Sequence, residues 1–211
     1  MSKYENYSHF IKKLVEYDVY DLTRKFKIQS SPDESVELYN SVINSPAGDI
    51  VEVGSASGGT TIILIKAAGN VGKIVYSIDP YPVELEGKAT HYTTGGTQKL
   101  KNEFAKNILN GEYSNIIQYN KNTVDVIDIL PKKLSIVFID GLHEYSYVMD
   151  EMKLLYPLLV KDGWLYIHDT NWTIGQISNT RQGGLDNIWN NIDKKMFSEI
   201  KKVGSMFCGK K

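Results

Sequence analysis

The chain has 211 residues, 42% of them hydrophobic, and its 24 Lys and Arg against 25 Asp and Glu give a formal net charge of −1. This length predicts one domain with a substantial core, and the near-neutral charge argues against a nucleic acid partner, which requires a positive field. The N-terminus lacks a signal peptide's apolar stretch and no apolar run reaches the roughly 18 residues of a membrane-spanning helix, so we expect a cytoplasmic protein without membrane contact.

The N-terminal part is predicted to be helical. Pro32 and Asp33 mark the start of a helix over Pro32–Ile43, because proline is favoured at the first helical position. We expect a single domain over 1–211, in which a helical cap (1–45) covers the cofactor or substrate side of a core (46–211).

From Asp49 onward, short apolar, β-branched runs alternate with longer amphipathic segments, as in the βαβ units of a parallel sheet. The predicted strands are Ile50–Val53, Lys73–Ile78, Ile116–Tyr119, Ser135–Ile139 and Trp164–His168. The predicted crossover helices are Gly59–Ala68, Gln98–Leu109, Thr123–Leu130 and Tyr145–Leu159.

The C-terminal part predicts a helix from Leu185 to about Lys195 and then two short strands that turn at Gly204. The expected fold class is therefore α/β, with a Rossmann-like, doubly wound, mostly parallel seven-stranded sheet, a C-terminal antiparallel hairpin and helices on both faces. The single cysteine, Cys208, cannot form an internal disulfide, and we expect an unreactive thiol.

The first predicted strand carries an acid and runs into a glycine-containing turn. Glycines let a backbone approach a ligand, and the N-terminus of the following helix offers free N–H groups. A plain strand-to-helix turn would also explain the glycines. Glu52, however, would be an unpaired buried charge in an apolar strand unless a polar group reaches it, and this favours a ligand site.

The glycine spacing is not that of a dinucleotide fold, because Ala56 stands where Gly-x-Gly-x-x-Gly has its middle glycine. The segment resembles the first motif of class I methyltransferases, which depend on S-adenosylmethionine (SAM). It is especially similar to a bacterial small-molecule methyltransferase family related to macrocin O-methyltransferase and cephalosporin hydroxylase proteins. The resemblance implies that Glu52 faces the methionine ammonium of SAM and that the loop holds the cofactor through Gly54, Ser55, Ala56, Ser57, Gly58 and Thr60.

Two further strand ends fit a bound SAM. Asp79 follows the second strand and could accept hydrogen bonds from ribose hydroxyls, although an Asp before a proline is also an ordinary turn residue. Asn122 and Thr123 follow the third strand, where such enzymes contact adenine. Both are also common helix-capping residues.

The fourth and fifth strand ends carry the clearest chemistry. Asp140 and His143 follow the fourth strand, and Asp169 lies at the end of the fifth, so all three should line one crevice. Two carboxylates from neighbouring strands suit Mg²⁺ or another divalent cation, although Asp140 and His143 could instead hydrogen-bond each other. The related family has the same Asp-Gly-x-His-x-Tyr segment and His-Asp pair. By analogy with catechol-type enzymes, Asp140 and Asp169 bind the metal and Thr170 or Asn171 completes its shell. His143 is the catalytic base, and Asp140 is counted with it among the catalytic residues and also among those that contact the cofactor.

The sequence thus predicts a SAM-dependent O-methyltransferase that acts on a hydroxyl of a small molecule, such as a sugar or secondary metabolite. Two segments, Tyr81–Thr97 with His91 and Tyr92, and Trp172–Arg181, are expected to decide the acceptor. A catalytically silent SAM-fold binding or assembly protein and an NAD-dependent oxidoreductase are the alternatives. The oligomeric state stays open, with a homodimer among the candidates.

Overall fold

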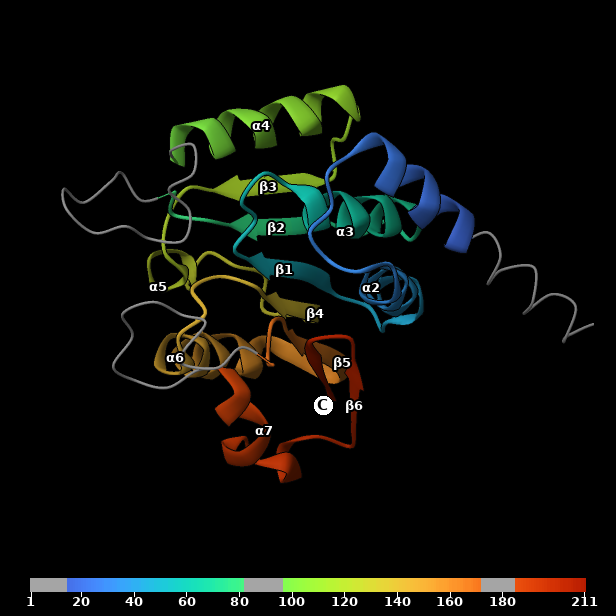
Figure 1. Ribbon diagram of the computed structural model, residues 1–211. Helices are drawn as coiled ribbons and strands as arrows, with labels where there is room; N and C mark the ends of the chain where they lie inside the picture. Colours follow the sequence, from blue (N-terminus) through green and yellow to red (C-terminus); the bar gives the residue numbers. More distant parts are fainter. Residues whose placement is uncertain (1–14, 82–96, 172–184) are drawn as a thin grey trace, which may run out of the picture.

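Figure 1 shows the computed structural model, which describes residues 15–81, 97–171 and 185–211. Within these residues, one sheet has the strand order β3-β2-β1-β4-β5-β7-β6. Strands β1 to β5 pair in parallel, whereas β7 is antiparallel to both β5 and β6. The strands are β1 (Asp49–Val53), β2 (Val75–Ile78), β3 (Ile116–Tyr119), β4 (Leu134–Ile139), β5 (Leu159–Ile167), β6 (Glu199–Val203) and β7 (Met206–Lys210). The predicted fold class, including its antiparallel hairpin, is confirmed.

Helices cover both faces of the sheet (Figure 1). Successive strand residues point to opposite faces, so Ile136 and Phe138 of β4 join one apolar cluster and Val137 and Ile139 join another. Helices α2 and α3 bury their apolar side chains in the first cluster, and α6 does so in the second. The helices are α2 (Pro32–Asn44), α3 (Gly59–Asn70), α4 (Thr97–Asn110), α5 (Thr123–Val126), α6 (Tyr145–Leu155) and α7 (Ile188–Asn191).

Helix α2 begins with a capping box. The Ser31 hydroxyl accepts from the Glu34 backbone N–H, and the Glu34 carboxylate accepts from the Ser31 backbone N–H. The helix packs along α3, and the predicted helix over Pro32–Ile43 is confirmed with one more residue. Residues 15–25, also helical, precede it.

The predicted helix from Leu185 to Lys195 is wrong as a continuous element. The chain instead forms a 3-10 turn (Leu185–Asn187), the short helix α7 and a second 3-10 turn (Lys194–Met196). Ile192 is extended, and the Asp193 side chain accepts from the Lys195 backbone N–H at 3.0 Å. An Asp that caps a new turn in this way competes with helix continuation.

Proline shortens two other predicted helices. Helix α5 ends at Val126 and turns continue the chain to Leu130, where Pro131 disfavours a helical conformation of the preceding residue. Helix α6 ends at Leu155 and is followed by a 3-10 turn that contains Pro157, so that β5 begins earlier than predicted, at Leu159.

Most of the two segments expected to select the acceptor, including His91, Tyr92, Trp172 and Arg181, lies outside the described residues. In the three described ranges, no helix has both the length and the apolar character needed to cross a membrane.

Candidate active site

The glycine loop after β1 is held in conformations that favour glycine. Gly54 and Gly58 both have φ of 86°, and Ala56 has φ of 44°. A Cβ on Gly54 would lie 2.3 Å from the Asp140 carbonyl oxygen, so the loop presses against the end of β4. Ala56 takes a left-handed conformation that costs an L-residue roughly 1–2 kcal/mol, which explains why a glycine is commoner there.

Glu52 lies inside the sheet with 0% exposure. Its Oε2 accepts a hydrogen bond of 2.6 Å from the Thr61 hydroxyl, whereas its buried Oε1 has no hydrogen-bond partner among the described residues. Burial raises the pKa of this carboxyl to about 8, although the Thr61 hydrogen bond lowers it. One oxygen therefore satisfies the expectation that a polar group reaches Glu52, and the other is a buried acceptor without a hydrogen-bond partner among the described residues.

Asp79 organises the glycine loop. Its Oδ2 accepts from the backbone N–H groups of Ser55 (3.1 Å) and Ala56 (2.9 Å), and its Oδ1 accepts from that of Tyr81 (2.9 Å). The Tyr81 hydroxyl donates back to the Ala56 carbonyl at 2.7 Å. Burial raises the pKa of Asp79, and these hydrogen bonds lower it by less, so the pKa is above its ordinary value. Asp79 is thus the link that ties the end of β2 to the loop after β1.

The other predicted cofactor residues lie on the loop itself, at the start of α3 and at the start of α5. Ser57 accepts from Asn107 through its carbonyl at 2.9 Å, and Thr60 shares a buried hydrogen bond of 2.7 Å with Ser30. Asn122 precedes α5, and the buried Thr123 donates to Glu151 at 3.4 Å. Glu151, which the sequence did not single out, therefore contacts one of the predicted cofactor residues.

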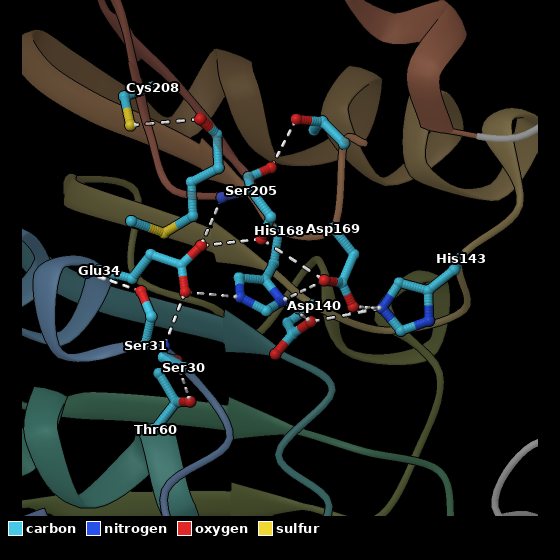
Figure 2. Close-up of polar contacts among 12 residues, drawn as sticks. Ser30, Ser31, Glu34, Thr60, Asp140, His143, His168, Asp169, Ser205 and Cys208 are labelled. Atoms are coloured by element: carbon cyan, nitrogen blue, oxygen red, sulfur yellow. Dashed lines mark hydrogen bonds and ion pairs between the residues drawn. The ribbon is translucent and has the colours of Figure 1, made fainter. Parts of the chain in front are cut away.

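Two aspartates and two histidines converge at the ends of β4 and β5 (Figure 2). His143 Nε2 lies 3.5 Å from Asp140 Oδ1 and 3.2 Å from Asp169 Oδ2. His168 Nδ1 lies 3.0 Å from the same Asp140 oxygen and 3.5 Å from Asp169 Oδ1. One ligand atom from each residue lies within 4.8 Å of the others, which is a grouping that could hold a metal ion. The predicted Asp140, His143 and Asp169 are therefore brought together, and His168 joins them.

A third carboxylate lies behind His168. Glu34 Oε2 is 3.4 Å from His168 Nε2, and Glu34 Oε1 accepts from the backbone N–H and the hydroxyl of Ser205, at 2.7 and 2.8 Å. The side chains of His168 and Glu34 are only 8% and 4% exposed. Figure 2 shows Glu34 on one side of His168 and the two aspartates on the other.

The cluster is strongly polarised. Burial lowers the pKa of His143, but hydrogen bonds to Asp140 and Asp169 outweigh it and raise that pKa to about 9. Burial also lowers the pKa of His168, but its hydrogen bonds to Asp140, Asp169 and Glu34 outweigh burial and raise that pKa to about 12. Burial favours the neutral form of Glu34 and Asp169, yet their histidine partners hold both pKa values well below the usual range. Without a metal ion, the carboxylates of Glu34 and Asp169 are thus charged and paired with protonated histidines.

The structure does not bring Thr170 or Asn171 into this group. The Thr170 hydroxyl donates to the Ser205 carbonyl at 2.6 Å and accepts from Trp189 Nε1 at 2.9 Å, and Asn171 is exposed. His168 had a signal in the sequence, since it directly precedes Asp169 at a strand end. Glu34 had none beyond its place in a capping box.

The strand order, the antiparallel β7 and the acid ahead of the glycine loop are those of the class I methyltransferase fold. Residues 51–170, more than half of the chain, match a family model described as "Methyltransferase domain". The chain belongs to this methyltransferase family.

Solved structures of low identity share the fold. An O-methyltransferase from Bacillus cereus in complex with S-adenosylhomocysteine (SAH) has a TM-score of 0.61 and 14% identity, covering 93% of this chain and 90% of that one. The O-methyltransferase TomG from Streptomyces achromogenes, involved in tomaymycin synthesis and in complex with SAM, has a TM-score of 0.60 and 11% identity, covering 92% and 87%.

A curated relative, "Uncharacterized protein R132" of Acanthamoeba polyphaga mimivirus, is 26% identical over 122 residues. The match covers 56% of this chain and 50% of the relative, so this chain spans half the length of that protein.

Proposed function

We propose that the protein is an O-methyltransferase that transfers the methyl group of SAM to a hydroxyl of a small molecule, such as a sugar or a secondary metabolite. In this proposal a divalent cation at Asp140 and Asp169 assists the reaction, and His143 takes up the hydroxyl proton. The O-methyltransferase activity named for the two solved structures of the same fold supports the choice of oxygen as acceptor.

The chain's polar groups fit the cofactor. When bound, SAM supplies an electrophilic methyl group, so no nucleophilic side chain is needed. The partnerless Glu52 Oε1 suits its ammonium group, and Asp79 lies at the next strand end, where a ribose would need an acceptor. Asn122 and Thr123 follow β3 at the same carboxyl end of the parallel strands.

The Asp140 and Asp169 carboxylates fit a cation, because two hard oxygen donors at neighbouring strand ends are the ligands that divalent cations prefer. A bound cation would lower the pKa of an acceptor hydroxyl. His143 lies at the more exposed end of the cluster, with 19% of its side chain accessible, and can meet an acceptor there. A cation bound at the aspartates would also lower the pKa of His143, because it would offset the negative charge that raises this pKa.

One observation carries the proposal. The glycine loop and the cluster share a boundary, since Gly54 abuts the backbone of Asp140 and leaves no room for a Cβ. A methyl donor on the loop and an acceptor at the cluster would therefore meet across the ends of β1 and β4, as direct transfer requires.

Calorimetric titration with SAH, with and without Mg²⁺ and with NADH as control, tests the donor. Micromolar SAH binding is expected, and preference for NADH would overturn it. A methyl-transfer assay across a panel of small hydroxyl compounds then tests the reaction. SAH binding without turnover on any of them would favour the silent binding protein.

A further inference from the structure

His168 is placed as a metal ligand would be. Its Nδ1 faces Asp140 Oδ1 at 3.0 Å and Asp169 Oδ1 at 3.5 Å, and its Nε2 faces the buried Glu34 at 3.4 Å. A histidine that binds metal through one ring nitrogen commonly donates its other N–H to a carboxylate, which fixes the tautomer and the ring orientation. Glu34 stands in that position.

We propose that His168 supplies a nitrogen ligand to the cation, that Glu34 is its positioning residue, and that the site therefore prefers a first-row transition dication such as Mn²⁺ over Mg²⁺. This rests on the proposed function for the cation at Asp140 and Asp169. Carboxylates alone would suit Mg²⁺, whereas imidazole nitrogen adds affinity for the transition metals.

The distances fit such a centre. A cation that holds its ligands at about 2.1 Å separates adjacent donor atoms by roughly 3.0 to 3.5 Å, for angles between octahedral and tetrahedral. The two distances from His168 Nδ1 to the aspartates, 3.0 and 3.5 Å, fall in that interval. The ligand atoms thus have a suitable separation without rearrangement of the backbone.

The other residues near the aspartates fit the third position less well. The Thr170 hydroxyl already donates to one group and accepts from another, and Asn171 is exposed. His143 Nε2 lies 3.5 and 3.2 Å from the aspartates, within the same interval, so distance alone does not separate the two histidines. The difference is in their surroundings, because the His143 side chain is more exposed than that of His168 (19% against 8%) and only His168 has a buried carboxylate behind it. It also lies on the side of the cluster away from Glu34 (Figure 2), which suits a group that meets the acceptor.

The test uses the full chain, stripped of metal by chelation and titrated with Mn²⁺ under electron paramagnetic resonance. Pulsed measurements report whether a ¹⁴N nucleus is bonded to the Mn²⁺, independently of activity. The wild type should show this coupling, which should become a ¹⁵N coupling in protein labelled with ¹⁵N-histidine. Mg²⁺ should displace Mn²⁺ only in more than tenfold excess.

Three variants separate the two histidines. His168→Ala should lose the nitrogen coupling, and Glu34→Gln should keep it while weakening Mn²⁺ binding about 10- to 100-fold, as for other residues behind a ligating histidine. His143→Ala, the matched control, should keep the coupling. SAH affinity reports whether each variant is folded. Should His168→Ala fail to fold, the ¹⁵N-histidine label in His143→Ala shows whether a histidine other than His143 binds the metal, and His168→Gln, which keeps more of the side-chain volume, repeats the test at His168 itself.

Nitrogen coupling that survives in His168→Ala or disappears in His143→Ala would overturn the proposal, as would equal affinity for Mn²⁺ and Mg²⁺ or no Mn²⁺ binding. The proposed function fails separately, through absence of SAH binding or of methyl transfer. A nitrogen-ligated Mn²⁺ in a protein without methyl transfer would support this inference alone, and methyl transfer with an oxygen-only Mg²⁺ site would refute it alone.

Discussion

Replacing Glu52 with glutamine should make the stability of the cofactor-free protein much less dependent on pH. Glu52 is fully buried, and burial raises its pKa from 4.5 to about 8. Between these two pH values, the folded chain binds a proton that the unfolded chain has lost. The contribution of Glu52 to stability is therefore complete below about pH 4.5, falls as the pH rises, and is lost above about pH 8.

The size of the effect follows from the same values. At about 1.4 kcal/mol for each pH unit, a rise in pKa from 4.5 to about 8 corresponds to about 5 kcal/mol. Glu52→Gln is neutral at every pH and can still accept from the Thr61 hydroxyl. The variant should match the wild type near pH 4.5 and exceed its free energy of unfolding by up to about 5 kcal/mol near pH 8.

Urea unfolding at pH 5, 6.5 and 8 measures this difference, with Glu199→Gln, at an exposed position of β6, as the control. The same substitution should weaken SAH binding about ten- to hundredfold, because a charged hydrogen bond is worth roughly 1.5–3 kcal/mol. A stability difference that stays constant with pH would refute the reasoning that Glu52 is held neutral by burial.

The remaining predictions concern the cluster and Cys208. Asp140→Ala and Asp169→Ala should each abolish metal-dependent turnover in steady-state assays and leave SAH affinity largely intact; loss of SAH binding alone would contradict the metal assignment. His143→Ala should lower kcat about 10²- to 10⁴-fold with little change in KM, and an unchanged kcat would remove it as the base. The buried Cys208 thiol, whose pKa burial raises to about 12, should react with a thiol reagent only in denaturant, so rapid labelling of the native protein would argue against its burial.

The sheet could be predicted because its signals are local. The strands are short β-branched runs, and Gly204, with φ of 56°, turns the hairpin at the predicted residue. Helix ends were less predictable. The helical spacing of apolar residues continues past the observed ends, whereas the chain leaves the helix near the Asp193 cap and near a proline.

The candidate site could be predicted where one strand end carries its own signal. Asp140 comes directly after β4 and Asp169 is the second residue after β5, so adjacent strands bring them together. Glu34 and His168 are 134 positions apart, and no local pattern links a capping box to a strand end. That contact depends on how α2 packs beside the hairpin, which a single sequence does not reveal.

The placement of these acids couples binding to stability. Four acids are poorly exposed and lie at or near the carboxyl end of the parallel strands: Glu34, Glu52, Asp140 and Asp169. Two histidines offset part of the charge in the cluster, whereas Glu52 has only a hydroxyl partner and is neutralised by its raised pKa. An ammonium group at Glu52 and a cation at the aspartates would each provide missing positive charge. Because such ligands bind the folded chain and not the unfolded one, each should stabilise the fold that assembles its site.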